Sequence, residues 1–153
     1  MTEAVSIGIV GVGVISAQYL EQLEQIADVR VGVVADIDAA RAAQVATASG
    51  ARSESVDELL ADPEVDIVLN LTTPPFHAAI DRSVLAAGKH VYSEKPLAVE
   101  LSDGRAVVAE AQRVGLRVGC APDTFLGTGL QTTLAALQSG RIGTPFAASA
   151  FWS

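Results

Sequence analysis

The chain has little of several features that would assign it to particular protein classes. Its 153 residues include one cysteine, Cys120, which excludes an intrachain disulfide and a zinc or iron–sulfur site built from cysteines. Ten Lys and Arg residues stand against eighteen Asp and Glu, so a basic face for nucleic acid or an anionic membrane is not expected. Apolar stretches are interrupted well before the roughly 18 residues that a membrane-spanning helix needs. The first four residues carry no basic side chain, so we predict no signal peptide and expect a cytoplasmic protein without nucleic-acid or membrane partners.

The composition that remains is that of a globular domain. Half of the residues are hydrophobic and 18% are charged, a balance that argues against a disordered chain. A chain of this length is expected to form one domain with a substantial core.

Apolar segments alternate with segments of helical spacing. The predicted strands are residues 5–10, 29–35, 66–71, 89–93, 116–120 and 146–152. The predicted helices are residues 14–26, 38–49, 55–61, 75–87, 101–114 and 127–138. Ser55 and Glu58 have capping-box spacing, and Gly50, Gly88 and Gly115 are placed to end helices. Continuous apolar strands separated by helices predict a parallel sheet covered on both faces.

This pattern predicts an α/β fold of the Rossmann type, with a doubly wound parallel sheet over residues 1–125. Residues 126–153 are expected to form a connecting helix and the first strand of a C-terminal substrate domain that is cut short after Ser153. The alternative is that segment 146–152 pairs at the sheet edge of a complete small protein.

A glycine-rich turn, Gly11-x-Gly13-x-x-Ser16, joins the first predicted strand to the first predicted helix. Gly11 permits a tight turn, Gly13 lets a pyrophosphate approach the backbone, and a small third residue allows close helix–strand packing. Gly11, Gly13, Val14 and Ile15 are predicted to bind a dinucleotide cofactor at the free N–H groups of the helix N-terminus. The alternative is a tight turn without a ligand.

An acidic residue, Asp36, ends the second predicted strand, about 20 residues after the glycine turn. A carboxylate there accepts hydrogen bonds from the adenosine ribose and repels a 2′-phosphate. Ile37 follows it, where an NADP site often has a cation, and Arg41 is assigned to the surface of the next helix. We therefore predict cofactor contacts from Asp36 and Ile37 and favour NAD over NADP. Asp36 has an alternative role as a turn or N-cap residue, which Asp38 would serve equally well.

Two further loops follow the predicted strands 66–71 and 89–93. The first reads Thr72-Thr73-Pro74-Pro75-Phe76-His77 and the second reads Glu94-Lys95-Pro96. Because ligands on open α/β sheets bind at the carboxyl ends of the strands, the first loop is predicted to face the cofactor crevice.

These motifs, in this order and spacing, resemble the N-terminal domain of the glucose–fructose oxidoreductase / inositol dehydrogenase (Gfo/Idh/MocA) family. The resemblance covers nearly the whole chain, and Glu-Lys-Pro is its most specific part. It implies an NAD(P)-dependent oxidoreductase that transfers hydride to or from a sugar, cyclitol or related polyol. It also implies a second, α/β substrate domain, which often carries the oligomer interface, so we expect a homo-oligomer.

The resemblance also assigns roles to the two loops. Lys95 matches the family lysine near the reacting carbon and is the predicted catalytic residue, while Glu94 and Pro96 shape its loop. Asp123, in the loop after the fifth predicted strand, could face the same crevice or be an ordinary turn residue. The cofactor-binding residues predicted in this half are Thr72, Thr73, Pro74, His77, Glu94, Lys95, Pro96 and Asp123.

Residue chemistry supports a catalytic role for Lys95 and leaves two roles open for His77. Transfer of hydride from an alcohol needs a group that takes the hydroxyl proton, which Lys95 can do. His77 could contact cofactor or substrate, or it could satisfy a backbone carbonyl in the first turn of its helix. No metal site is predicted.

Two other functions compete with the oxidoreductase. A non-catalytic dinucleotide-binding or scaffolding module would keep Gly11, Gly13 and Asp36 but tolerate loss of Lys95. A methyltransferase would give Glu-Lys-Pro no role. The family's catalytic residues in the C-terminal domain have no counterpart in this sequence, so we expect the chain alone to bind cofactor with little or no turnover.

Overall fold

The computed structural model describes residues 4–122 and 124–151. The chain divides into two compact units between Ala121 and Pro122, slightly before the boundary expected after residue 125.

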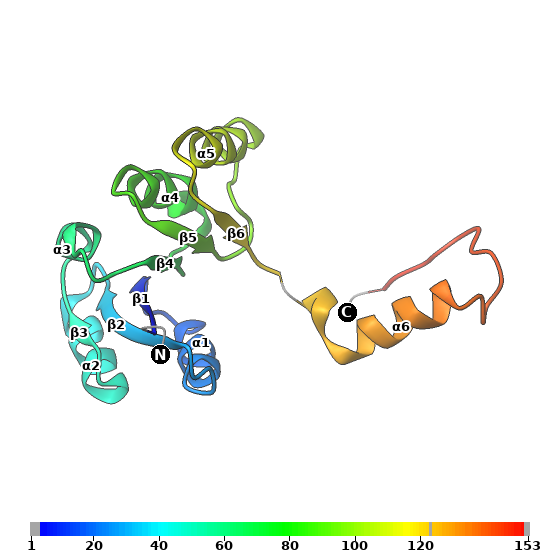
Figure 1. Ribbon diagram of the computed structural model, residues 1–153, viewed down its shortest axis with the longest axis horizontal. Helices are drawn as coiled ribbons and strands as arrows, with labels where there is room; N and C mark the ends of the chain where they lie inside the picture. Colours follow the sequence, from blue (N-terminus) through cyan, green and yellow to red (C-terminus); the bar gives the residue numbers. More distant parts are fainter. Residues whose placement is uncertain (1–3, 123, 152–153) are drawn as a thin grey trace. The chain divides into compact units, whose positions relative to one another are not determined.

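The first unit is built on a six-stranded sheet in the order β3-β2-β1-β4-β5-β6, with every neighbouring pair parallel (Figure 1). The strands are β1 (Val5–Val10), β2 (Val29–Ala35), β3 (Arg52–Ser53), β4 (Ile67–Asn70), β5 (His90–Ser93) and β6 (Val118–Cys120). The strand order reverses direction between β1 and β4, which are neighbours in the sheet. This is the doubly wound arrangement predicted from the sequence, and folds of this kind bind ligands outside the carboxyl ends of the strands at the reversal point.

Helices connect the strands of the first unit. They are α1 (Ser16–Leu23), α2 (Ala39–Ser49), α3 (Val56–Ala61), α4 (His77–Ala86) and α5 (Leu101–Val114), with a short 3-10 turn η1 (Pro74–Phe76) before α4. Gly50 and Gly115 follow α2 and α5 with φ angles of 72° and 73°, a left-handed conformation that favours glycine. Ser55 and Glu58 form the predicted capping box of α3.

Two apolar clusters lie on the two faces of the sheet because consecutive strand residues point in opposite directions. Val33 and Val68 belong to the cluster that contains buried residues of α3, α4 and α5. Their neighbours Val34 and Leu69 belong to the cluster covered by α1 and α2. Both faces are therefore covered, as the continuous apolar strands predicted.

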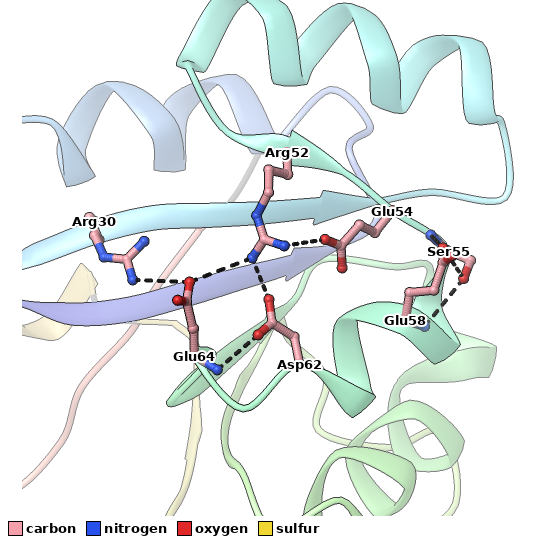
Figure 2. Close-up of polar contacts among 7 residues, drawn as sticks. All are labelled: Arg30, Arg52, Glu54, Ser55, Glu58, Asp62 and Glu64. Atoms are coloured by element: carbon pink, nitrogen blue, oxygen red, sulfur yellow. Dashed lines mark hydrogen bonds and ion pairs between the residues drawn. The ribbon is translucent and has the colours of Figure 1, made fainter.

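The edge strand β3 was not predicted, because its two exposed residues show no apolar pattern. Arg52 of this strand lies among acidic side chains from the following turns, as Figure 2 shows. Its guanidinium pairs with Glu54 at 2.5 Å and with Asp62, and Glu64 links the group to Arg30 at 3.8 Å. β3 thus pairs with β2 through its backbone, while its Arg52 side chain forms ion pairs with the turns that follow.

The second unit contains the 3-10 turn η2 (Thr124–Leu126) and the helix α6 (Thr128–Gln138), close to the predicted helix 127–138. The predicted strand 146–152 is not formed over residues 146–151, and residue 152 lies outside the described residues. A strand needs the backbone groups of a neighbouring strand, and none is present among the described residues of this unit. No helix among residues 4–122 and 124–151 has the length and apolar character needed to cross a membrane.

Candidate dinucleotide-binding site

The predicted site residues that the structure describes follow the carboxyl ends of neighbouring strands. Strand register aligns Val10 with Ala35 on one side and with Asn70 on the other, and Asn70 with Ser93. Gly11, Asp36, Thr72 and Glu94 follow these strand ends by one or two residues. Four segments that are distant in the sequence therefore begin side by side at the carboxyl ends of β2, β1, β4 and β5.

The two glycines of the first turn differ in whether the fold itself requires a glycine at their positions. Gly11 has a φ of +90°, and a Cβ atom there would lie 2.8 Å from the backbone N of Thr72. A side chain at this position would therefore strain the backbone and clash with the loop after β4. A Cβ atom on Gly13, in contrast, would meet no atom within 4 Å. The fold does not require glycine at position 13, and the open space above it suits a group that approaches the backbone closely.

The rest of the turn leads into α1. Ser16 is buried, and its hydroxyl donates a 2.7 Å hydrogen bond to the Gly13 carbonyl oxygen, which fits the predicted need for a small residue. Val14 is 99% exposed and Ile37, after β2, is 101% exposed. Ile15 is partly exposed. Val14 and Ile37 thus present apolar side chains to solvent, and the apolar parts of a nucleotide could cover them.

Asp36 is held by the glycine turn itself. Its Oδ2 accepts a 2.8 Å hydrogen bond from the Val12 N–H, and its Oδ1 accepts one of 2.8 Å from the Asp38 N–H. Burial alone would raise the pKa of the Asp36 carboxyl, but hydrogen bonds from Arg41 and these two backbone groups hold the pKa below its usual value. Asp36 is therefore an anion fixed beside the turn, while the N-cap of α2 is Asp38.

Arg41 lies on the surface of the helix after β2, as predicted, and its side chain pairs with Asp36. It lies in the first turn of α2, and its Nη2 donates to Asp36 Oδ1 at 2.7 Å. The Arg41 side chain is 45% exposed, whereas that of Asp36 is 5% exposed. A solvated guanidinium therefore covers the acidic residue predicted to bind ribose.

A buried polar network supports the loop after β4. The Asn70 amide nitrogen donates to Asp81 Oδ1 at 2.7 Å and to the His77 carbonyl oxygen at 3.0 Å. Its amide oxygen accepts from the Thr72 hydroxyl at 2.6 Å. Burial raises the pKa of the Asp81 carboxyl, and the Asn70 hydrogen bond partly offsets this rise. The network fixes the start of a loop whose next residues, Thr73 and Pro74, are exposed.

His77 joins this loop to the one after β5. The side chain is fully buried, with its Nδ1 2.6 Å from the Pro96 carbonyl oxygen and its Nε2 2.9 Å from the Thr72 carbonyl oxygen. These contacts match the second of the two roles considered for His77, because a side chain enclosed in this way acts on a ligand only through the loops it holds. We therefore reassign His77 from cofactor contact to positioning residue.

In the Glu-Lys-Pro loop, the Glu94 carboxylate is hydrogen bonded, whereas the Lys95 ammonium group has no partner among the described residues. Glu94 Oε1 accepts a 2.8 Å hydrogen bond from the Tyr19 hydroxyl of α1, and its Oε2 accepts from the Lys95 backbone N–H at 2.9 Å. The Lys95–Pro96 peptide bond is cis. Lys95 is exposed, and its ammonium group makes no hydrogen bond or ion pair within residues 4–122 and 124–151. The Lys95 ammonium group is therefore exposed and free of protein partners among the described residues.

Sequence reasoning missed the residues that support the site. Tyr19 lies within the predicted helix 14–26 and Asn70 within the predicted strand 66–71, and neither these residues nor Asp81 carries a predicted role. Cys120 ends β6, and burial raises the pKa of its thiol, as do the nearby charges of Asp81 and Glu94. The predicted contact Asp123 lies outside the described residues. Among the residues described, no group of His, Cys, Asp and Glu could hold a metal ion.

The geometry can be set beside known proteins. Residues 5–121 match the family model for Gfo/Idh/MocA proteins, described as an oxidoreductase family with an NAD-binding Rossmann fold. Inositol 2-dehydrogenase 3 of Saccharopolyspora erythraea is 35% identical over 94% of this chain and 44% of its own length.

Two solved structures carry informative ligands. The WlbA dehydrogenase of Chromobacterium violaceum, in complex with NADH and UDP-GlcNAcA, matches with a TM-score of 0.87 and 28% identity over 94% of this chain and 42% of its own. The biliverdin reductase of Synechocystis sp. PCC 6803, in complex with biliverdin and NADP+, matches with a TM-score of 0.76 and 29% identity over 87% of this chain and 43% of its own. The chain thus spans less than half the length of these proteins.

Proposed function

Because this chain belongs to the Gfo/Idh/MocA oxidoreductase family, we propose that it is the nucleotide-binding portion of an NAD(P)-dependent oxidoreductase. The observation that carries the proposal is the open space above Gly13, a glycine that the fold itself does not need. The anionic Asp36 lies beside it, at the reversal point of the sheet where such folds bind ligands.

The adenosine half of the cofactor is assigned to the first two strand ends. The backbone of Gly11, Gly13, Val14 and Ile15 would face the pyrophosphate, because the first N–H groups of a helix favour an anion. Asp36 would accept hydrogen bonds from the ribose, and Ile37 would cover the adenine side. The bound cofactor supplies the hydride acceptor or donor of the reaction.

The nicotinamide half is assigned to the loops after β4 and β5. Thr72, Thr73 and Pro74 would flank it on one side and Glu94, Lys95 and Pro96 on the other. His77 keeps these two loops together through its contacts with the Thr72 and Pro96 carbonyl oxygens. The two loops are thereby held together before any ligand binds.

Lys95 is the proposed catalytic residue. Oxidation of an alcohol releases the hydroxyl proton as hydride leaves the carbon, and the Lys95 amine would accept that proton. In the reverse direction the ammonium group would donate to the carbonyl oxygen. Its exposure and lack of protein partners among the described residues support this role.

The substrate proposed for the whole protein is a sugar, cyclitol or related polyol. The inositol dehydrogenase and the WlbA complex with UDP-GlcNAcA support this class. In the protein as a whole, residues 126–153 would lead into a substrate domain. We further assign the protein a cytoplasmic location and a homo-oligomeric state, and we expect this chain alone to bind cofactor without turnover.

The test is calorimetric titration of the chain with NAD, followed by a record of absorbance at 340 nm after addition of myo-inositol. Saturable binding without NADH formation is expected. An Asp36→Ala variant should bind NAD more weakly, while Asp28→Ala, an exposed change away from the site, should not alter binding. If the chain bound no dinucleotide, that result would contradict the proposal.

The role of Lys95 separates an enzyme from a binding module. In a form of the protein that oxidises a polyol, Lys95→Met should lower kcat about 100-fold or more, because it removes the proton acceptor. The NAD affinity of this chain should stay nearly unchanged, since the variant keeps the apolar stem. Unaltered turnover would instead favour a lysine without a chemical role.

A further inference from the structure

The two histidines of the chain, His77 and His90, have opposite partners at their ring nitrogens. The Nδ1 atom of His90 accepts a 3.0 Å hydrogen bond from the Arg117 backbone N–H, so this nitrogen carries no proton and the ring is neutral. Both ring nitrogens of His77 lie instead against backbone carbonyl oxygens, that of Pro96 at 2.6 Å and that of Thr72 at 2.9 Å. A carbonyl oxygen can only accept, so each contact needs an N–H group on His77.

A neutral imidazole cannot supply both N–H groups. It carries one proton, and its other nitrogen would point a lone pair at a carbonyl lone pair. The His77 side chain is fully buried, and contacts of 2.6 and 2.9 Å leave no space for a water molecule between the two atoms. The 2.6 Å contact is also short, as charge-assisted hydrogen bonds are. Only the imidazolium ion, which has two N–H groups, satisfies both carbonyl oxygens.

A buried cation needs a compensating charge, and Asp81 can supply it. His77 and Asp81 are an i, i+4 pair on α4, which places them on one face of the helix, and both are fully buried. They form no direct ion pair. The Asn70 amide nitrogen links them, because it donates to Asp81 Oδ1 at 2.7 Å and to the His77 carbonyl oxygen at 3.0 Å. Asp81 Oδ2 has no hydrogen-bond partner among the described residues, so its charge is compensated through space.

The other groups near Asp81 are uncharged. The buried Ser93 hydroxyl carries no charge. Burial, followed by the charges of Asp81 and Glu94, raises the pKa of the Cys120 thiol, which favours its neutral form. Burial also raises the pKa of the Asp81 carboxyl, whereas hydrogen bonding and the His77 charge lower it. Among the described residues, His77 is therefore the cation that compensates Asp81.

We propose that His77 is held as an imidazolium ion with the buried Asp81 carboxylate as its counter-ion, which makes Asp81 a positioning residue for the loops after β4 and β5. The effect on cofactor binding rests on the proposed function, which assigns these two loops to the nicotinamide half. Removal of the carboxylate favours the neutral ring, so one of the two carbonyl contacts is lost. The loop that carries Lys95 beside Pro96 would then separate from the loop that begins at Thr72.

The first test detects the ring protons directly. Nitrogen-15 NMR of the full chain, labelled at histidine and free of ligand, distinguishes protonated from unprotonated ring nitrogens. The spectrum is recorded at about pH 7, where an unperturbed histidine is mostly neutral. A His90→Gln variant removes one set of signals and so assigns the other. His77 should show two protonated nitrogens, whereas Nδ1 of His90 should be unprotonated.

The second test removes the counter-ion. Asp81→Asn keeps the shape of the side chain without its charge, and His77 should then lose one of its two N–H groups at the same pH. Asp28→Asn, an exposed change, should leave both in place. In calorimetric titration, Asp81→Asn should bind NAD about tenfold more weakly, the effect of one lost charge-assisted hydrogen bond. Adenosine 5′-monophosphate, which has no nicotinamide, should bind both chains equally.

The inference can fail in distinguishable ways. An unprotonated nitrogen on His77 in the natural chain would contradict the imidazolium, and this result needs neither a folded variant nor a bound cofactor. Two protonated nitrogens in Asp81→Asn, or an equal loss of affinity for NAD and the monophosphate, would contradict the role of Asp81. If the natural chain binds neither ligand, the proposed function and the positioning role fail together, while the His77 spectrum still decides the charge state. Circular dichroism checks that each variant is folded.

Discussion

Asp36 shows how one residue can serve the fold and the site together. Its carboxylate satisfies the Val12 N–H of the glycine turn and the Asp38 N–H before α2. The sequence indicated an acid at this strand end and offered two roles, ribose binding or a turn. The structure assigns the turn contacts directly, while the ribose contact remains a proposal.

The pH dependence of stability should report the hydrogen bonds that the Asp36 carboxylate accepts from Arg41 and from the Asp38 and Val12 N–H groups. Because its folded pKa is lowered, its stabilising contribution is fully present above the unfolded pKa of about 3.9 and is lost as pH falls through the folded pKa. Asp36→Asn should therefore lower the free energy of unfolding by about 1–3 kcal/mol at pH 7. The difference from the natural chain should shrink below about pH 4.

Urea unfolding at pH values from 3 to 8 measures this difference. Asp28→Asn, which removes an exposed carboxylate outside the turn, should follow the natural chain throughout. A deficit in Asp36→Asn that stays constant from neutral to acid pH would contradict the assignment.

The side-chain contacts that support the site could not be predicted from the sequence. The Tyr19 hydroxyl meets Glu94 from a position 75 residues away in the chain. Nothing in the local pattern of α1 distinguishes Tyr19 from an ordinary apolar-face residue. Likewise Arg41 reads as a surface helix residue until the end of β2 is placed beside it. Such pairs depend on how elements are brought together, which a single sequence does not encode locally.

Elements were easier to predict than contacts, because apolar periodicity and helix-ending glycines are local signals. Segments 29–35 and 101–114 match β2 and α5 at both ends. The two failures involve strands. β3 is too short and exposed to show a pattern, and segment 146–152 has the pattern of a strand but finds no partner strand among the described residues of its unit.

The capping box of α3 gives an element-scale prediction. The Ser55 hydroxyl accepts from the Glu58 N–H at 3.2 Å, and Glu58 Oε2 accepts from the Ser55 N–H at 2.9 Å (Figure 2). Ser55→Ala should lower the free energy of unfolding by about 1 kcal/mol, the usual value of an N-cap. Urea denaturation tests this, with Ser102→Ala on the exposed first turn of α5 as the control. Equal stability of the two variants would show that the cap contributes nothing to α3.

At the scale of the whole molecule, the sheet and its apolar core belong to the first unit. All six strands and both apolar clusters lie before Pro122. Helix α6, in the second unit, buries none of its described residues. The proposed cofactor residues other than Asp123 also belong to the first unit.

A chain that ends at Ala121 should therefore keep the Tm of the full chain and its affinity for NAD. A chain that ends at Gly115 loses β6, which pairs with β5, and should unfold at a clearly lower temperature. Thermal unfolding followed by circular dichroism compares the three. A large drop in Tm for the chain ending at Ala121 would mean that residues 122–153 stabilise the sheet.

The most direct test of the central claim is calorimetric titration of NAD into the natural chain and into Gly13→Ala, side by side. The added methyl group meets no protein atom within 4 Å, so the variant should keep its Tm. It would occupy the space assigned to the pyrophosphate, and the account predicts NAD binding weakened by about tenfold or more. Equal affinity of the two chains, or no binding by either, would contradict the claim that this turn is a dinucleotide site.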